Sequence, residues 1–340
     1  MMKVHRNIPV FIPHLGCPNQ CVFCNQRSIS GCREFCLGDV RRIIDEGLAR
    51  IDAQAETEIA FFGGSFTGID RGLMIDLLEI AQEYVRRGLV SGIRLSTRPD
   101  YISEEILDIL SSYAVSNVEL GLQSMSDEVL AATRRGHTAR DAEFACRAIV
   151  ERGFALTGQM MIGLPGASPE SEVRTAERIC ELGATFARIY PTVVFLDTPL
   201  CEMAKCGTYT PLSVDEAVIR SANAYEVFLR AGVSCIRIGL CATEELISPQ
   251  FVYAGPNHPA LGELVMSEVY YRNTVSFLKS NTLLGKDIVL EVPTRELSRA
   301  VGQHRRNIER LHLETGTHVL RVRGRADIDR INAYVPCERH

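Results

Sequence analysis

Short apolar runs alternate with longer amphipathic stretches along most of the chain. The short runs have the length of β-strands and occupy residues 10–12, 58–62, 93–96, 117–120, 158–162 and 186–190, and an apparent seventh strand is flanked by Cys235 and Cys241. Between them, apolar residues recur at helical spacing in residues 39–51, 71–87, 103–112, 139–152 and 169–182. This alternation predicts an α/β fold whose parallel sheet is closed, or nearly closed, as a barrel. The chemistry of such barrels lies at the carboxyl ends of the strands.

The pattern changes from about residue 285. We expect a strand at residues 288–292, helices at 295–301 and 306–313, and a strand at 318–322. Residues 294–330 contain nine Arg, no Lys and five acids, so this tail carries a charge of about +4 and the rest of the chain about −9. We therefore predict a barrel with its C-terminal extension at 1–245, a connecting or docking helix region at 246–284 and a small basic module at 285–335.

The composition bounds the class of protein. With 340 residues, 46% hydrophobic and 23% charged, the chain is neither disordered nor collagenous nor a coiled coil. The apolar run near the start is short and is broken by Pro9, Pro13 and His14, so we expect no signal peptide, and no segment is long enough to span a membrane. We expect a cytoplasmic protein, in which twelve cysteines are metal ligands or free thiols rather than disulfides.

Three cysteines stand directly after the first predicted strand. Cys17, Cys21 and Cys24 form a C-x3-C-x2-C pattern. Three thiolates from one loop can hold three irons of a 4Fe–4S cluster and leave the fourth iron open to a further ligand. The same spacing also suits zinc, with Cys32, Cys36 or His14 as the fourth ligand, or no metal at all.

The residues around these cysteines resemble a known family. Residues 17–24, CPNQCVFC, with Phe23 just before the last cysteine, resemble the signature of the radical S-adenosylmethionine superfamily. In that family the loop follows the first strand of a partial (β/α)6 barrel. Residues 63–67, GGSFT, resemble its glycine-rich motif after the second strand, although Ser65 replaces the usual acidic residue.

Further motifs narrow the resemblance. Residues 97–101, 118–124, 133–138, 159–165, 188–192 and 208–211 are similar, in the same order, to the radical domain of the Elongator catalytic subunit, and the likeness runs from about residue 8 to 245. Two departures matter: the Elongator subunit spaces its first two cluster cysteines more widely, and no acetyltransferase domain can be placed here. The chain therefore resembles short bacterial-type Elongator-like proteins, and an acetyl-CoA-dependent reaction cannot simply be carried over.

The resemblance implies a 4Fe–4S cluster and S-adenosylmethionine as cofactors. Reductive cleavage of S-adenosylmethionine would give a 5'-deoxyadenosyl radical that takes a hydrogen atom from the substrate, with an electron donor such as flavodoxin or ferredoxin. By motif position, the cluster ligands are Cys17, Cys21 and Cys24, and the residues around S-adenosylmethionine are Phe23, Gly63, Gly64, Ser65, Ser96, Gln123 and Arg135.

Particular contacts follow from the same resemblance. Gly63 and Gly64 are implied to meet the methionine amino group, and Ser96 a ribose hydroxyl. Gln123 and Arg135 are implied to meet the carboxylate and ribose region, where a guanidinium can grip a carboxylate with two hydrogen bonds. The alternatives are that Gln123 only caps a loop and that Arg135 is a surface charge.

The other cysteines call for simpler interpretations. Cys146 and Cys180 lie at apolar helix positions and are expected in the core. Cys32 and Cys36 bind a second metal or nothing, with nothing preferred. We find no partner pair for Cys201 and Cys206, and a hydrogen-atom donor role for Cys241 rests on one thiol alone.

The basic tail resembles the core of a KH domain. Two predicted helices are joined by a glycine-containing turn and followed by a strand, as in KH domains, whose GxxG loop clamps a nucleic-acid backbone. Arg305 stands where the second glycine would be. We predict RNA contacts at Arg299, Gly302, Arg305 and Arg306, within a basic footprint that includes Arg295 and Arg310. The alternative is a solvated face of a packing module.

These features lead to one preferred function and two alternatives. The preferred function is a cytoplasmic radical S-adenosylmethionine enzyme that modifies an RNA, with tRNA the favoured substrate. The first alternative is a radical enzyme that acts on a small molecule or tetrapyrrole and has a structural tail. The second is a non-catalytic RNA-binding protein that holds zinc or a cluster.

Overall fold

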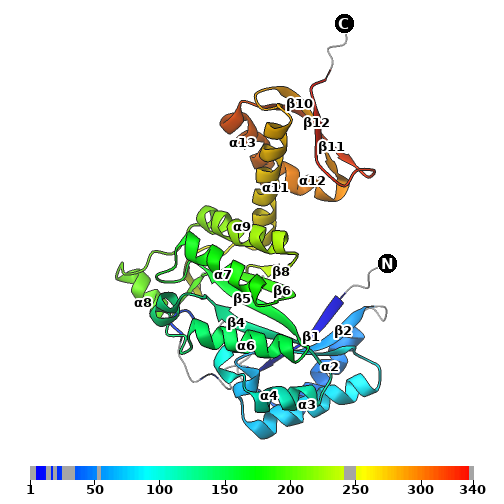
Figure 1. Cartoon of the computed structure of the whole chain (residues 1–340), viewed down its shortest axis with the longest axis vertical. Coiled ribbons are helices and arrows are strands. Elements are labelled where there is room, and N and C mark those ends of the chain that lie inside the picture. The colour runs from blue at the N-terminus through cyan, green and yellow to red at the C-terminus, as the bar shows by residue number, and fades with distance from the viewer. Residues whose placement is uncertain are drawn as a thin grey trace. The chain divides into compact units, whose positions relative to one another are not determined.

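The chain forms two compact units in a computed structural model (Figure 1). The structure describes residues 5–12, 17, 21–24, 35–51, 55–240 and 250–336. The first unit comprises Met1–Ser213 and Asn223–Pro259, and the second comprises Val214–Ala222 and Ala260–His340. Among the described residues, no helix is both long enough and apolar enough to span a membrane. The three-part division made from the sequence stays a prediction.

A parallel sheet of seven strands is the frame of the first unit. Its strands follow one another in the order β1 (His5–Ile12), β2 (Glu56–Gly63), β3 (Gly92–Thr97), β4 (Val115–Gln123), β5 (Ala155–Ile162), β6 (Phe186–Pro191) and β8 (Ser234–Ile238). In the described part of the chain, β1 and β8 are edges that do not pair with each other, so the sheet is a curled half-barrel. The predicted α/β partial barrel is confirmed, but it is not closed.

Helices follow the strands where the periodicity predicts them. They are α2 (Val40–Ala49), α3 (Arg71–Arg86), α4 (Glu104–Ser111), α6 (Ala139–Glu151) and α7 (Pro169–Glu181). The start of α6 is fixed by a capping box between Thr138 and Asp141, and that of α7 by one between Ser168 and Ser171. In both helices the cap is a polar residue directly before the amphipathic segment, so it sets where the loop ends and the helix begins.

Several short elements were not predicted. They are α5 (Asp127–Ala132), α8 (Pro199–Lys205) and the antiparallel pair β7 (Val194–Phe195) and β9 (Val252–Ala254). The short 3₁₀ turns η1 (Leu37–Asp39), η2 (Phe66–Gly68) and η3 (Pro99–Tyr101) lead into helices α2, α3 and α4, and α9 (Val214–Ala231) follows α8. Cys235 lies inside β8 rather than beside it, because the strand starts at Ser234, and Cys241 lies outside the described residues.

The strands turn apolar side chains toward the helices and polar ones toward the opposite, inner face. In β3, Ile93 and Leu95 are fully buried in the main core, whereas Arg94 and Ser96 alternate with them and lie on the inner face. Ile59 and Phe61 of β2 follow the same pattern. The sheet is thus packed by helices on one face and lined with polar groups on the other.

Four charged side chains form a chain of ion pairs across this inner face. Arg94 Nε donates to Glu58 Oε2 at 2.8 Å and its Nη1 to Glu119 Oε1 at 3.0 Å. Arg188 Nη2 then donates to Glu119 Oε1 at 2.9 Å. At most 12% of any of these four side chains is exposed. We call this set, Glu58, Arg94, Glu119 and Arg188, the charge ladder; it joins β2, β3, β4 and β6.

Hydrogen bonds favour the charged form of Glu58 in the charge ladder. Burial alone raises the pKa of Glu58, but hydrogen bonds from Ser116 and Arg94 and the charge of Arg94 outweigh it and lower the pKa overall. His5 Nε2 also lies 2.8 Å from Glu58 Oε2. The charges are therefore compensated within the sheet rather than by solvent.

The second unit is a small sheet covered by helices. It contains part of α9, then α11 (Leu261–Ser280), β10 (Asp287–Pro293), η4 (Thr294–Glu296), α12 (Leu297–Val301), η5 (Gln303–Arg305), α13 (Arg306–Thr315), β11 (His318–Arg325) and β12 (Asn332–Tyr334). The strand order is β11-β10-β12, with β10 parallel to β11 and antiparallel to β12. The four elements predicted for the tail are confirmed, and β12 was not predicted.

Removing Arg94 tests the importance of the charge ladder. Arg94→Met leaves Glu58 and Glu119 buried without their shared cation, so we expect the free energy of unfolding to fall by about 3–5 kcal/mol in urea titrations. The control is Arg86→Met, because the Arg86 side chain is 64% exposed and its ion-pair distance is 4.0 Å. The control should change stability by no more than about 0.5 kcal/mol. Equal effects of both substitutions would contradict a structural role for the ladder.

Candidate cofactor and metal site

The cysteine loop is anchored through the residues between its cysteines. Val22 donates its backbone N–H to Thr133 O at 3.2 Å and accepts from Leu200 N at 2.9 Å. Its side chain is buried in a small apolar cluster with Val194, Leu200, Cys201 and Tyr209. Phe23 packs against the same cluster, so the structure gives this residue a packing contact, and its predicted contact with a cofactor stays a prediction.

Two arginines approach the buried sulfur of Cys21. Arg135 Nη1 lies 3.2 Å from Cys21 Sγ, and Arg98 Nη1 lies 3.8 Å from the same atom. Only 5% of Arg135 and 3% of Arg98 is exposed. Arg135 is thus not a surface charge, and its guanidinium lies at the thiol of the second cysteine. Hydrogen bonds from guanidinium groups favour an anionic sulfur ligand.

Arg98 connects several of these groups, and no role was predicted for it. Its Nε and Nη2 donate to the two carboxylate oxygens of Asp100, each at 2.9 Å, and Nη2 also donates to the backbone oxygen of Arg135. Burial opposes the charged form, but Asp100 outweighs it and raises the pKa of Arg98. Arg98 lies in the motif at 97–101. Its contact with Cys21 depends on how the chain folds, so the motif alone does not show it.

The glycine-rich motif ends β2 beside β1. Gly63 has a φ of +116°, and a Cβ placed there would come within 2.6 Å of Ile12 O, so only glycine fits. Gly64 N donates to the same oxygen at 2.9 Å. The structural reason for Gly63 is therefore the close approach of β1. Ser65 is buried, and its Oγ lies 3.7 Å from Cys17 Sγ.

A small depression lies at the carboxyl ends of β1, β2 and β3. It has no room for a water-sized sphere, and it is lined by Ile12, Phe62, Gly64, Ser65, Phe66, Ile69 and Ser96. Ser96 donates its hydroxyl to Glu119 Oε2 at 3.3 Å, which links this depression to the charge ladder. Three predicted cofactor residues, Gly64, Ser65 and Ser96, therefore come together at one place.

Gln123 ends β4 in a strained conformation. Its φ of +67° is unusual for a residue with a side chain, and its buried Oε1 has no hydrogen-bond partner among the described residues. Its Nε2 lies 3.0 Å from where a Cβ of Gly121 would be, and Arg135 Nη2 donates to Gly121 O at 2.6 Å. An unpartnered buried acceptor at a strand end is typical of a group that awaits a ligand.

The three thiols of the loop are not drawn together. Cys24 N donates to Cys21 O at 3.0 Å, which closes a turn, and Cys17 contacts Ser65. Within the described ranges, no three His, Cys, Asp or Glu side chains form a group that could hold a metal. Metal binding itself supplies the free energy that gathers such ligands. The assignment of the three thiols stays a prediction, and the alternative ligands His14 and Cys32 lie outside the described residues.

The remaining described cysteines are free thiols. Cys146 is fully buried in the core, where burial raises the pKa of its thiol to about 12, and Cys180 packs against that core. These two interpretations are confirmed. Cys201 is buried in the cluster around Val22, whereas Cys36 and Cys206 are exposed.

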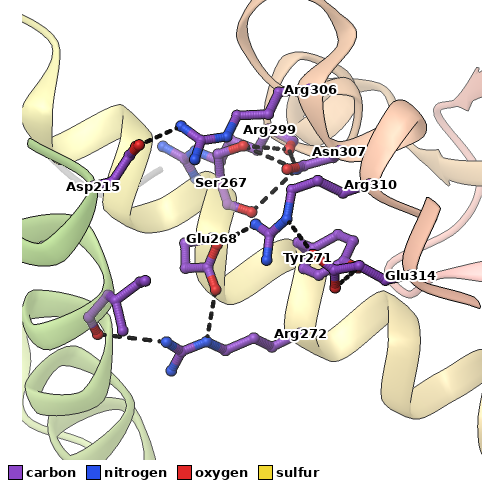
Figure 2. Close-up of polar contacts among 11 residues, drawn as sticks. Asp215, Ser267, Glu268, Tyr271, Arg272, Arg299, Arg306, Asn307, Arg310 and Glu314 are labelled. Carbon is purple, nitrogen blue, oxygen red and sulfur yellow. Dashed lines mark hydrogen bonds and ion pairs between the residues drawn. The ribbon is translucent and has the colours of Figure 1, made fainter. Parts of the chain in front are cut away.

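Two of the predicted RNA contacts are engaged in ion pairs within the second unit. Arg299 Nη2 lies 3.2 Å from Glu263 Oε1. Arg306 Nη1 lies 2.8 Å from Asp215 Oδ1, a pair that Figure 2 shows. Arg310, which belongs to the same footprint, is likewise paired. Their positive charges are therefore partly compensated by acids of the same chain.

The turn between α12 and α13 is held by its own hydrogen bonds. Gly302 has a φ of +76° and Arg305 a φ of +63°, so a residue with a side chain adopts the left-handed conformation where a second glycine would be favoured. Asn307 Nδ2 donates to Arg299 O at 2.9 Å and to Ser267 Oγ at 3.0 Å. The RNA contacts predicted here stay predictions.

Two family models match the chain. The model of the radical S-adenosylmethionine superfamily matches residues 11–179, and the model of the radical S-adenosylmethionine C-terminal domain matches residues 184–271. Together they span more than half of the chain. The cysteine loop and the strand ends described above lie within the first match.

Relatives and solved structures agree with these matches. An uncharacterised protein of Methanocaldococcus jannaschii is 29% identical over 228 residues, covering 62% of this chain and 68% of that protein. The tRNA uridine(34) acetyltransferase of the same archaeon is 32% identical over 127 residues, covering 36% of this chain and only 24% of that enzyme. The archaeal Methanocaldococcus infernus Elp3 structure superposes with a TM-score of 0.60 at 20% identity, covering 83% of this chain and 64% of that chain. This likeness shows the fold.

The site contains one histidine whose titration can be measured. His137 is buried, and burial together with the nearby Arg135 lowers its pKa to about 4, although Asp100 Oδ1, 3.8 Å from its Nδ1, acts in the opposite direction. The unfolded chain binds this proton near the ordinary pKa of 6.5. Between pH 6.5 and 4 only the unfolded state gains it, so the native state loses stability as the pH falls.

We therefore expect His137 to contribute an acid-dependent loss of stability of up to about 3 kcal/mol. The measurement is the free energy of unfolding of the wild type and of His137→Gln as a function of pH. The difference between the two should change across pH 6.5 to 4 and be constant above that window. Parallel profiles would show that the ring titrates alike in both states.

Proposed function

Since this chain belongs to the radical S-adenosylmethionine superfamily, it is a radical enzyme that uses a 4Fe–4S cluster and S-adenosylmethionine, and we propose that it modifies an RNA, specifically a tRNA. The observation that carries the substrate class is the 32% identity with a tRNA uridine(34) acetyltransferase. The match covers a quarter of that enzyme, so the acetyl transfer itself is not part of the proposal.

The residues present fit these cofactors. Three thiols stand on one loop, which suits a cluster with one iron left open. Gln123 Oε1 is buried without a described partner, and Ser65 and Ser96 place hydroxyl groups at the ends of their strands. When bound, the cluster would supply the electron for reductive cleavage of S-adenosylmethionine, and S-adenosylmethionine would supply the radical chemistry that acts on the substrate.

The protein's own contribution is to bind and orient. We assign Cys17, Cys21 and Cys24 as the iron ligands, with Arg135 and Arg98 donating hydrogen bonds toward Cys21. Hydrogen bonds to cluster sulfurs are among the features that set a cluster's reduction potential. Asp100 holds Arg98 from behind with two hydrogen bonds and compensates one of the two positive charges.

The cofactor residues at the strand ends are oriented by the sheet. We assign Gly63, Gly64, Ser65 and Ser96 to one side of the bound S-adenosylmethionine and Gln123 to the other. Ser96 is held by Glu119 of the charge ladder, which fixes the direction of its hydroxyl. Because the inner face is polar and is not covered by the core helices, it is where we place the substrate nucleotide.

We also propose a reducing compartment and a small electron donor. None of the nine described cysteines forms a disulfide, as expected of a cytoplasmic protein with reduced thiols. An electron must reach the cluster for each cleavage, and a flavodoxin or ferredoxin is the class of partner suited to deliver it. Neither assignment depends on the identity of the RNA.

One reaction tests the proposed function. Anaerobically reconstituted protein is incubated with dithionite, S-adenosylmethionine and unfractionated tRNA, and the products are analysed by mass spectrometry. We expect 5'-deoxyadenosine together with a change in mass of one tRNA nucleoside. Cys17→Ser, Cys21→Ser and Cys24→Ser combined should abolish both products and the bound iron, because the cluster loses its ligands.

The matched control is Cys206→Ser, because Cys206 is an exposed thiol of the same unit outside the loop. It should retain iron and both products. Release of 5'-deoxyadenosine with an unchanged tRNA would contradict the RNA substrate while leaving the radical enzyme in place. Loss of iron in the control would contradict the assignment of the loop.

A further inference from the structure

Among the residues that the structure describes, helices pack on one face of the sheet of the second unit. Toward the helices it packs Ile288, Leu290 and Val292 of β10, against residues of α11, α12 and α13. The opposite face has Val289 and Glu291 buried at its centre, with Arg321, Arg323, Arg325, Asn332 and Tyr334 on the strands beside them, a set that we call the open face. We propose that the open face binds a single-stranded segment of RNA; this inference rests on the proposed function and identifies the surface that recognises the substrate class.

A β-bulge places the arginines of β11 on this face. The register pairs Ile288 with Val319 but Val289 with Arg321, so Leu320 is the extra residue. After the bulge, Val322 faces the helices. Side chains alternate between the two faces of a strand, so Arg321, Arg323 and Arg325 lie on the open face. Without the bulge, the alternation would turn these arginines toward the apolar core, so the irregularity is what presents them to solvent.

The open face carries positive charge that the protein does not compensate. Arg325 Nη1 and Asn332 Nδ2 both donate to Glu291 Oε2, at 3.3 Å and 3.1 Å, and Arg325 is also paired with Asp327. Arg321 and Arg323 are exposed, and neither forms an ion pair with any residue that the structure describes. Two guanidinium groups are thus available to phosphates.

The turn between α12 and α13, where RNA contacts were predicted, differs from the open face because nearby arginines are paired with acids. Figure 2 shows ion pairs between side chains of α11 and α13, in which Arg310 Nη1 donates to Glu268 Oε2 at 2.5 Å and its Nε to Glu314 Oε1 at 3.1 Å. Glu268 also accepts from Arg272 Nε at 3.0 Å. An incoming phosphate would have to displace these carboxylates. The open face requires no such exchange at Arg321 and Arg323.

The arrangement of the open face suits an extended nucleotide chain. Successive arginines of β11 are two residues apart, which is about 6.8 Å along a strand and is comparable to the distance between neighbouring phosphates of a single strand. Tyr334 is partly exposed and accepts a hydrogen bond from Arg323 Nη1 at 3.1 Å. An aromatic ring fixed beside a guanidinium provides a surface on which a base can stack.

The same arginines have a simpler possible role. β11 is an edge strand, and charges on an edge prevent pairing with other chains. That role predicts no effect on RNA affinity, so a binding measurement separates the two.

The test uses the full chain and fluorescently labelled oligouridine, with binding followed by anisotropy over a range of salt concentrations. Arg321→Glu with Arg323→Glu should weaken binding by at least about tenfold and reduce the slope of log K against log salt by about 1.4, because two phosphate contacts are lost. Arg321→Gln with Arg323→Gln should have a smaller effect in the same direction and serves if charge reversal disturbs the strand. Tyr334→Ala should weaken binding without changing the slope.

Two further double variants show whether the loss of RNA affinity is specific to the open face. Arg140→Glu with Arg147→Glu makes the same change of charge on exposed residues of α6, and it should leave affinity within about twofold if the site is local. Arg305→Glu with Arg306→Glu tests the turn between α12 and α13. We expect this turn pair to weaken binding less than the open-face pair.

The outcomes are distinguishable. If the open-face variants bind like the wild type while the turn variants lose affinity, the open face is not the site, but an RNA substrate is still supported. If the wild type binds neither oligouridine nor tRNA, the RNA part of the proposed function fails. If all three Glu pairs weaken binding equally, the attraction is a general charge effect and the open face is not a specific site.

Discussion

The ion pairs that run from Glu58 through Arg94 and Glu119 to Arg188 are the constraint on which the first unit depends. A half-barrel has an inner face that the helices do not cover, and polar side chains there must find partners in one another. The charge ladder meets this requirement and joins four strands. Through Ser96, which donates to Glu119, it also fixes one residue of the candidate cofactor site.

A second buried network serves the cysteine loop. Arg98 connects Asp100, the backbone of Arg135 and the sulfur of Cys21. One side chain therefore joins three separate segments of the chain. Gln123 is strained, and its own Oε1 has no partner among the described residues, so this strand end is not optimised for stability alone. Hydrogen bonds within the protein hold several of these donors and acceptors in place, which is what orienting a reactive intermediate requires.

The strands and longer helices could be predicted because their apolar periodicity is sustained and their caps are explicit, as at Thr138 and Ser168. The ladder could not be predicted, because a charged residue in a strand gives no sign of its partner until the sheet order is known. For the same reason the contact of Arg135 with Cys21 could not be predicted, while its predicted contact with S-adenosylmethionine stays a prediction. In the tail, counting arginines predicted a basic surface, but the partner of Arg306 is Asp215, 91 residues away. β7 and β12 contain two and three residues, too few to show a period.

The most direct test of the central claim, that this loop holds a cluster which acts on S-adenosylmethionine, is electron paramagnetic resonance of the reconstituted, dithionite-reduced protein. We predict the signal of a reduced 4Fe–4S cluster that changes shape when S-adenosylmethionine is added, because the open iron acquires new ligands. A cluster signal that S-adenosylmethionine leaves unaltered, or iron bound without such a signal, would contradict the account.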